Sequence, residues 1–307
     1  MIDLSVIIPV YNSEDNLIEL THQLFDSLKS YQFELIFIND LSKDNSWDVI
    51  KEICITRNNI IGIDLRKNFG QDNAIMAGLF KAQGNFIVIM DDDLQHSPYD
   101  IPALYSKCKE GYDVCYAKFI HIKQVLWKNI GSYINGFVAE ILINKPKNIY
   151  LSPFMIIKKD IIEKIIEYDG PYPYIQGLIF NITDNITQIN IEHNDRYKGN
   201  SNYNFIRSFS LFLNLATNFS IIPLRFSTFI GIISSIIGFS MLPYYFIRYL
   251  QGNYQIQGWT TLVTLLLIFG GLILLSLGLI GEYLGRIYLK INRKPQYIIK
   301  EIITSGK

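Results

Sequence analysis

The sequence has few of the residues that build thiolate metal sites or redox centres. Its three cysteines, Cys54, Cys108 and Cys115, form no C-x-x-C pair, and the four histidines are scattered without zinc-ligand spacing. We interpret the cysteines as reduced and structural, which fits a cytosolic location for the part that carries them.

The sequence also has no excess of charge and no common phosphate-binding loop. Lysine plus arginine and aspartate plus glutamate balance at 28 each, so no overall field favours a nucleic-acid partner. The patterns G-x-x-x-x-G-K-[ST] and G-x-G-x-x-G are both absent, which removes P-loop and dinucleotide-binding interpretations. No basic segment with a cleavage site opens the chain, so we expect no signal peptide.

Apolar runs alternate with helical patterns in the first ~95 residues, which predicts an α/β fold with a parallel sheet and helices on both faces. Ser13 is a candidate cap for a helix with leucines at positions 17, 20, 24 and 28. The later pattern is looser. The expected strands are residues 4–10, 33–38, 60–65 and 86–90, then 113–117, 154–157 and 186–193, with helices opening near 13 and 44 and another at 71–83.

Three aspartates follow the run Phe86–Met90, where a buried strand leaves the sheet. Ligands of open α/β sheets bind at that edge, and Mg²⁺ prefers carboxylate oxygens together with substrate phosphate. The three crowded aspartates, Asp91, Asp92 and Asp93, therefore suggest a divalent-cation site. A solvated acidic loop is the alternative.

Three other loops carry polar side chains that suit a nucleotide. Asp40 ends the second strand and would accept hydrogen bonds from a base or ribose, or serve as a turn residue. Arg66 and Lys67 precede Gly70 and a helix N-terminus, an arrangement that suits a phosphate or a plain basic turn. The loop 196–203 could close over an anion or merely connect two elements.

Two uncharged runs, 226–247 and 260–280, are each long enough to cross a bilayer. Basic residues outside both runs place both ends of this hairpin in the cytoplasm. The segment 204–224 has a large apolar face and predicts a helix lying on the membrane.

These features in this order resemble the polyprenyl-phosphate glycosyltransferases of glycosyltransferase family 2. The similarity covers nearly the whole chain. The matching segments are Val6–Asn12, Asn39–Asp40, Arg66–Gln71, Asp91–Gln95, Arg196–Tyr203, Pro223–Arg225, Gly281–Tyr288 and Lys294–Tyr297.

The resemblance implies a role for each matching position. Pro9, Tyr11 and Glu14 would lie around the nucleotide, with Asp40 at its uracil–ribose end. Asp91, Asp93 and Gln95 would hold Mg²⁺ or Mn²⁺ on the donor diphosphate, and Lys67 and Asp92 would lie near the same nucleotide. The remaining assignments are Arg196 and Ser201 in a loop closing on the phosphates, and Lys128 and Ser132 at the acceptor phosphate. Ser152–Met155 stands where relatives often carry Gly-Asp-Phe-Arg, which removes an acid and an arginine.

The resemblance implies a GT-A type (Rossmann-like) domain at 1–203, an interfacial helix at 204–224, a transmembrane hairpin at 225–288 and a cytoplasmic tail at 289–307. The implied reaction is inverting transfer of a sugar from a UDP-sugar to undecaprenyl phosphate at the inner membrane of a bacterium, by a homo-oligomer, a tetramer by resemblance. Two alternative functions are less well supported. A processive polysaccharide synthase would carry a Gln-x-x-Arg-Trp motif and more membrane spans, and this sequence has neither. A non-catalytic nucleotide-binding membrane protein would not need both Asp91 and Asp93, which this sequence retains.

Overall fold

A computed structural model describes residues 2–119, 145–146, 149–170, 172–191, 222–251, 258–292 and 295–304. The chain divides into two compact units, Met1–Tyr203 with Arg293–Lys307, and Asn204–Asn292. The four predicted sites at Lys128, Ser132, Arg196 and Ser201 lie outside the described residues, as does most of the expected interfacial helix.

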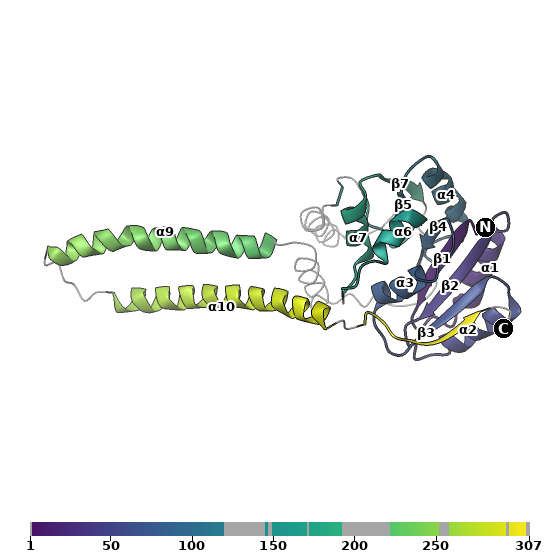
Figure 1. The fold of residues 1–307 in the computed structure, drawn as a ribbon, viewed down its shortest axis with the longest axis horizontal. Helices are drawn as coiled ribbons and strands as arrows, with labels where there is room; N and C mark the ends of the chain where they lie inside the picture. Colours follow the sequence, from purple (N-terminus) through teal and green to yellow (C-terminus); the bar gives the residue numbers. More distant parts are fainter. Residues whose placement is uncertain are drawn as a thin grey trace. The chain divides into compact units, whose positions relative to one another are not determined.

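The first unit is built on one eight-stranded sheet with the order β7-β5-β6-β4-β1-β2-β3-β8 (Figure 1). Strands β1, β2, β3 and β4 are mutually parallel, while β6 and β8 run antiparallel to β4 and β3. This mostly parallel sheet confirms the predicted fold class. The strands are β1 Leu4–Val10, β2 Phe33–Asn39, β3 Ile60–Leu65, β4 Phe86–Ile89, β5 Val114–Phe119, β6 Met155–Lys158, β7 Ile186–Ile191 and β8 Ile299–Thr304.

Helices cover both faces of this sheet because its central strands are apolar on both sides. Leu4, Val6 and Ile8 point into a core shared with the buried leucines of α1, whereas Ile7 and Ile38 lie against Gly78 of α3. A Cβ on Gly78 would lie 2.8 Å from both of those isoleucines, so glycine allows α3 to pack this closely. The helices are α1 Leu17–Ser27, α2 Ser46–Thr56, α3 Gln71–Leu79, η1 Pro98–Asp100, α4 Ile101–Lys109, α6 Lys159–Ile165 and α7 Ile175–Ile182.

Two local expectations change. Ser13 does not cap α1: the cap position is Asn16, whose N–H donates to the Ser13 carbonyl oxygen, so Ser13 lies in the preceding turn. Helix α3 ends at Leu79 rather than at residue 83, and the N–H groups of Lys81 and Ala82 share the Gly78 carbonyl oxygen in the closing turn.

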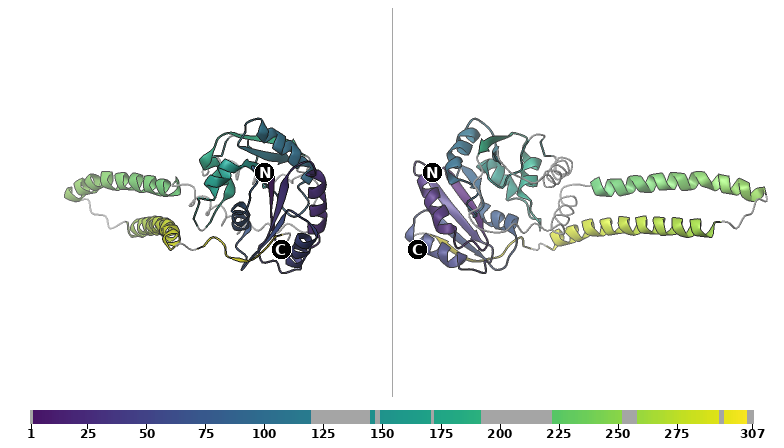
Figure 2. Two further views of the ribbon diagram at one scale, coloured as in Figure 1. Left: turned by 45° about the vertical axis from the view of Figure 1, so that its right-hand side comes forward. Right: turned by 180° about the vertical axis from the view of Figure 1, so that it is seen from behind.

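The last strand was not predicted from the sequence. Residues of the expected C-terminal tail form β8, which pairs antiparallel with β3 from Ile61↔Thr304 to Leu65↔Ile299. Figure 2 shows this yellow strand lying along the purple and blue strands of the N-terminal half. The chain therefore returns to its first unit after leaving it for the second.

The second unit contains two long helices, α9 Ile222–Leu250 and α10 Trp259–Ile291. They include the two predicted apolar runs and lie side by side, with a hydrogen bond of 2.5 Å between the hydroxyls of Ser227 and Ser276. Within the described residues, one segment, Ile268–Ile291, is long and apolar enough to cross a membrane, judged by length and composition.

Candidate active site

The loops that leave β1, β2, β3 and β4 all emerge at the carboxyl edge of the sheet. Register brings their starting points together: Val10 pairs with Asn39, and Asn39 pairs with Asp64. Strand β4 lies on the other side of β1, with Ile89 opposite Ile7. Residues far apart in the sequence therefore meet on one rim, where open α/β sheets bind their ligands.

Each of these four loops contains a residue in the left-handed backbone region. These are Asn12 (φ 56°), Leu41 (φ 53°), Gly70 (φ 90°) and Leu94 (φ 62°). Two of them are leucines, for which this conformation is unfavourable by roughly 1–2 kcal/mol. Such backbone strain concentrates at functional sites, so the two leucines favour this rim as a site, although a positive φ also occurs elsewhere, at Asn59 and Gly111.

Asp40 links the loops after β2 and β3. Its Oδ1 accepts the Phe69 N–H at 2.7 Å and its Oδ2 accepts the Gly70 N–H at 2.8 Å. Burial raises the pKa of Asp40 above its ordinary value, and the two N–H donors oppose that rise. Asp40 therefore supports the turn that presents the N-terminus of α3. Any contact with a nucleotide would use its remaining acceptor positions.

A second set of hydrogen bonds joins the loops after β1 and β2. The Asn12 N–H donates to Ser42 Oγ at 3.0 Å, and the Lys43 N–H donates to Asn12 Oδ1 at 2.7 Å. Glu14, expected near the nucleotide, accepts the Asn45 N–H at 2.8 Å. These bonds hold the two loops as one rigid edge.

The middle aspartate of the acidic run faces the β1 loop. Asp92 Oδ2 accepts the N–H of Tyr11 at 3.2 Å, and Ser13 also bonds to this carboxylate. Burial raises the pKa of Asp92 to about 6. Asp92 thus joins β1 to β4, while the Tyr11 side chain is 44 % exposed.

The flanking aspartates are half-buried and have partners different from those of Asp92. Asp91 Oδ1 accepts the side-chain amide of Gln71 at 2.7 Å, which links it to the first turn of α3. Asp93 Oδ1 accepts the Gln95 N–H at 3.1 Å, so the backbone of Gln95 is part of the turn. Asp91, Asp93 and Gln95, the three residues expected to hold a cation, thus lie in one short turn at the end of β4.

This donor set suits a hard divalent cation that also binds a phosphate. Among the described residues, no three His, Cys, Asp or Glu side chains are grouped to hold a metal by themselves. Mg²⁺ is usually held by one or two carboxylates, with water and substrate phosphate completing its shell. Two carboxylates on a turn beside a helix N-terminus meet that requirement.

The other predicted nucleotide residues also lie at this rim. Pro9 is the penultimate residue of β1 and pairs with Ile38. Lys67 is exposed in the β3–α3 loop, with its ammonium 4.8 Å from the centre of the Phe69 ring.

Sequence reasoning missed two parts of the site. His96, buried to 4 % exposure, accepts the Asp91 N–H on Nδ1 at 3.1 Å. Its position three residues after Asp93 was a signal in the sequence, but nothing in the sequence predicted its aromatic neighbours. The second is buried Asp64, which accepts hydrogen bonds from Asn39 at 2.7 Å and from Lys300 of β8 at 2.8 Å.

The segment Ser152–Met155, where an acid and an arginine were expected by resemblance, is an apolar and buried part of the core. Ser152 and Phe154 are fully buried, and the Ser152 carbonyl oxygen accepts the Gln176 amide at 3.2 Å. Phe154 stacks on His96. The segment therefore contacts the acidic turn through the stacking of Phe154 on His96, which in turn accepts the Asp91 N–H.

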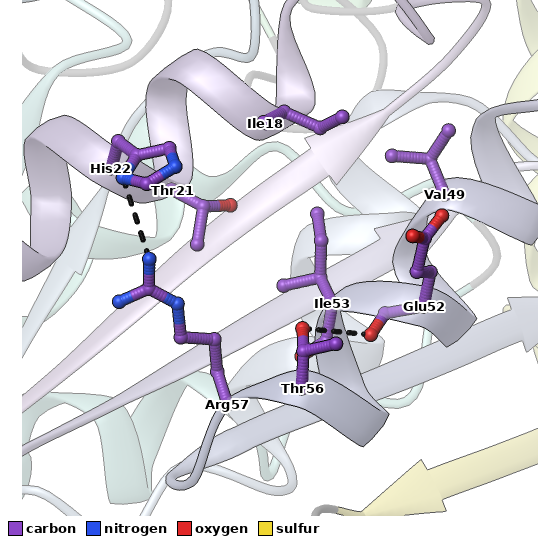
Figure 3. Close-up of a pocket in the computed structure, with 8 residues that line it drawn as sticks. All are labelled: Ile18, Thr21, His22, Val49, Glu52, Ile53, Thr56 and Arg57. Atoms are coloured by element: carbon purple, nitrogen blue, oxygen red, sulfur yellow. Dashed lines mark hydrogen bonds between the residues drawn. The ribbon is translucent and has the colours of Figure 1, made fainter.

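A separate groove of about 240 Å³ lies between α1 and α2 (Figure 3). Arg57 reaches across it to His22 at 3.4 Å. None of the residues predicted from the sequence lines this groove.

Comparison with known proteins identifies the family of this chain. The model of glycosyl transferase family 2 matches residues 5–166. An undecaprenyl-phosphate 4-deoxy-4-formamido-L-arabinose transferase of Proteus mirabilis (strain HI4320) is 31 % identical over 97 % of this chain and 93 % of its own. An uncharacterized glycosyltransferase of Bacillus subtilis (strain 168) is 32 % identical over 98 % of this chain and 94 % of its own.

Solved structures show the same fold. Glucosyl-3-phosphoglycerate synthase of Mycobacterium tuberculosis, in complex with UDP, has a TM-score of 0.52 at 16 % identity and covers 70 % of this chain and 78 % of its own. The same synthase with Mn²⁺, UDP and glucosyl-3-phosphoglycerate also has a TM-score of 0.52. The first unit is thus a GT-A type domain, and this chain belongs to glycosyltransferase family 2.

Proposed function

We propose that this protein transfers a sugar from a UDP-sugar to a polyprenyl phosphate, with undecaprenyl phosphate as the natural acceptor, at the cytoplasmic face of a bacterial inner membrane. The acidic turn Asp91–Gln95 on the carboxyl rim carries this proposal. The full-length similarity to a transferase that acts on undecaprenyl phosphate supports the acceptor. The Mn²⁺ and UDP bound by a GT-A neighbour support the donor and the cation.

In the proposed reaction an oxygen of the acceptor phosphate attacks the anomeric carbon of the sugar. The bond between that carbon and the β-phosphate oxygen breaks, and its electron pair leaves with UDP. Attack from the opposite side inverts the configuration. A phosphate monoester has its second pKa near 6 and is largely dianionic at neutral pH, so no strong general base is required. This accounts for the absence of an acid at Ser152–Met155.

The chain's own residues bind and orient the donor. Asp91 and Asp93, with Gln95, would hold Mg²⁺ or Mn²⁺, which stabilises negative charge on the departing diphosphate. The N-terminus of α3, fixed by Asp40, presents backbone N–H groups and a positive dipole to an anion at the same rim. Arg196 and Ser201 are proposed to close on the phosphates, and Lys128 and Ser132 to meet the acceptor phosphate.

The second unit is proposed to anchor the protein in the membrane. Helices α9 and α10 would cross the bilayer as a hairpin with both ends in the cytoplasm, and residues 204–224 would lie on its surface. Assembly into a homo-oligomer, a tetramer by resemblance, completes the proposal.

The test is a panel of nucleotide sugars offered to the purified full-length protein with undecaprenyl phosphate and Mg²⁺, with products identified by mass spectrometry. We expect one UDP-sugar to yield a polyprenyl monophosphate sugar, and chelation with EDTA to stop the reaction. Asp91→Asn, which keeps the shape of the side chain, should abolish transfer with unchanged thermal unfolding. No product from any nucleotide sugar, or full activity of Asp91→Asn, would refute the proposal.

A further inference from the structure

We propose that His96 is a positioning residue that fixes Asp91 in the orientation needed to bind the divalent cation. This inference rests on the proposed function and extends it to a residue for which the family resemblance implied no role. It follows from three contacts of the imidazole ring: two with aromatic rings and one with the backbone of Asp91.

Two phenylalanines hold the plane of the His96 ring. Phe119, at the end of β5, stacks on it with a centroid distance of 5.5 Å and an interplanar angle of 13°. Phe154, just before β6, stacks on it at 5.2 Å and 12°. All three side chains are buried, so the imidazole has little freedom to tilt.

The held ring then fixes the backbone of the acidic turn. The Asp91 N–H donates to His96 Nδ1 at 3.1 Å. Because Nδ1 accepts this bond, the neutral ring carries its proton on Nε2. That nitrogen is 3.9 Å from Asp91 Oδ2, which is beyond hydrogen-bonding distance, so the bond to the backbone N–H is the polar contact that carries the inference.

The geometry of the turn brings the His96 ring back to Asp91. Leu94, in the left-handed region, reverses the chain so that His96 returns to Asp91 five residues earlier. Gln71 holds the other carboxylate oxygen from α3 at 2.7 Å. Asp91 is thus held from two sides. This resembles the way that outer residues orient the ligands of metal sites, where losing such a residue costs about 10–100-fold in metal affinity.

Substitutions of two lengths separate the contacts. In His96→Asn the amide oxygen can occupy the place of Nδ1 and accept the Asp91 N–H. In His96→Gln the longer side chain reaches the place of Nε2 and loses that acceptor. His96→Ala removes all three contacts of the imidazole, and Phe154→Leu removes one of the two rings stacked on it. His22→Ala changes an exposed histidine of α1 and is the matched control.

The readout is Mn²⁺ affinity of the full-length protein in the presence of UDP, measured from the electron paramagnetic resonance signal of free Mn²⁺. UDP affinity in EDTA reports whether each variant keeps its nucleotide site. We expect His96→Ala and His96→Gln to lose about 10–100-fold in Mn²⁺ affinity, and His96→Asn to stay within about threefold of the wild type. The His96 variants should have the UDP affinity of the wild type in EDTA. His22→Ala should have the wild-type affinity for both Mn²⁺ and UDP.

Activity gives an independent readout. If His96 only positions Asp91, its variants should raise the KM for Mn²⁺ and recover most of kcat at saturating Mn²⁺. Should His96→Ala fail to fold, the pair His96→Asn and His96→Gln decides the question, with about a tenfold difference in Mn²⁺ affinity expected between them.

Equal Mn²⁺ affinity in the wild type and His96→Ala, or in the Asn and Gln variants, would overturn the role of His96 and leave the proposed function standing. If UDP binding by the wild type did not depend on Mn²⁺, the cation site of the proposed function would be refuted. The role of His96 would then be refuted as well.

Discussion

The contact between Lys300 and Asp64 gives the sharpest stability prediction, because it joins the last strand to the parallel sheet. Lys300 Nζ donates to Asp64 Oδ2 at 2.8 Å, across 236 residues of sequence. The Asp64 side chain is 2 % exposed, whereas that of Lys300 is 51 % exposed. The pair is therefore asymmetric: a buried carboxylate receives a half-solvated ammonium.

Lys300→Met keeps much of the side-chain volume and removes the charge. Asp64 would retain only its 2.7 Å bond from Asn39 among the contacts described above. A hydrogen bond to a charged group contributes about 1.5–3 kcal/mol, and the exposure of Lys300 lowers the expected loss to about 1–2 kcal/mol. We expect Lys300→Met to reduce the free energy of unfolding by that amount.

A double-mutant cycle with Asp64→Asn isolates the interaction, since it cancels the independent effects of each change. Hydrogen exchange of the β8 amides supplies a local measurement, and exchange there should speed up in Lys300→Met. Lys29→Met is the control: its partner is Asp26 at 3.5 Å and both side chains are mostly exposed, so about 0.5 kcal/mol or less is expected.

A coupling energy near zero, together with unchanged exchange in β8, would refute the view that this pair fastens the strand. The same contact affects any attempt to study the first unit alone. A chain truncated before α9 would lose β8 and Lys300 as well as α9 and α10, and would leave Asp64 without its ammonium.

Two further predictions concern other parts of the first unit. Burial raises the pKa of Asp72 to about 6, so the folded wild type takes up a proton as pH falls from about 6 to 4 and is stabilised there. At pH 7.5, Asp72→Asn should therefore have a free energy of unfolding about 1–2 kcal/mol higher than that of the wild type. Below about pH 4 the two proteins should be equally stable, because Asp72 is then protonated in both the folded and the unfolded wild type. Denaturation curves of variant and wild type that coincide at pH 7.5 would contradict this prediction. Gly84→Ala would place a Cβ 2.6 Å from the Ser5 backbone nitrogen, so a loss above about 2 kcal/mol is expected in thermal or denaturant unfolding. Gln83→Ala, at the exposed neighbouring position, is its control. Equal stability of the two variants would contradict the prediction, because it would mean that the backbone near Ser5 shifts to accommodate the Cβ at little cost.

How much of the site the sequence could predict is clear from particular residues. The placement of Asp40 and Asp91–Gln95 at one edge followed from strand periodicity, because the carboxyl ends of parallel strands share an edge. The orientation of each carboxylate did not follow. Asp92 faces the Tyr11 N–H and Asp40 faces the α3 N-terminus, and these directions depend on φ angles of loop residues that no pattern specifies.

What the sequence determined by itself is local in origin: the central strands, the long apolar helices and the acidic run that follows β4. Each follows from the spacing of neighbouring side chains. Only the tertiary structure placed β8 beside β3, Lys300 on Asp64, and His96 against Phe119 and Phe154. Those contacts join residues far apart in the chain. They are set by how sheet, loops and core pack together, which no local pattern encodes.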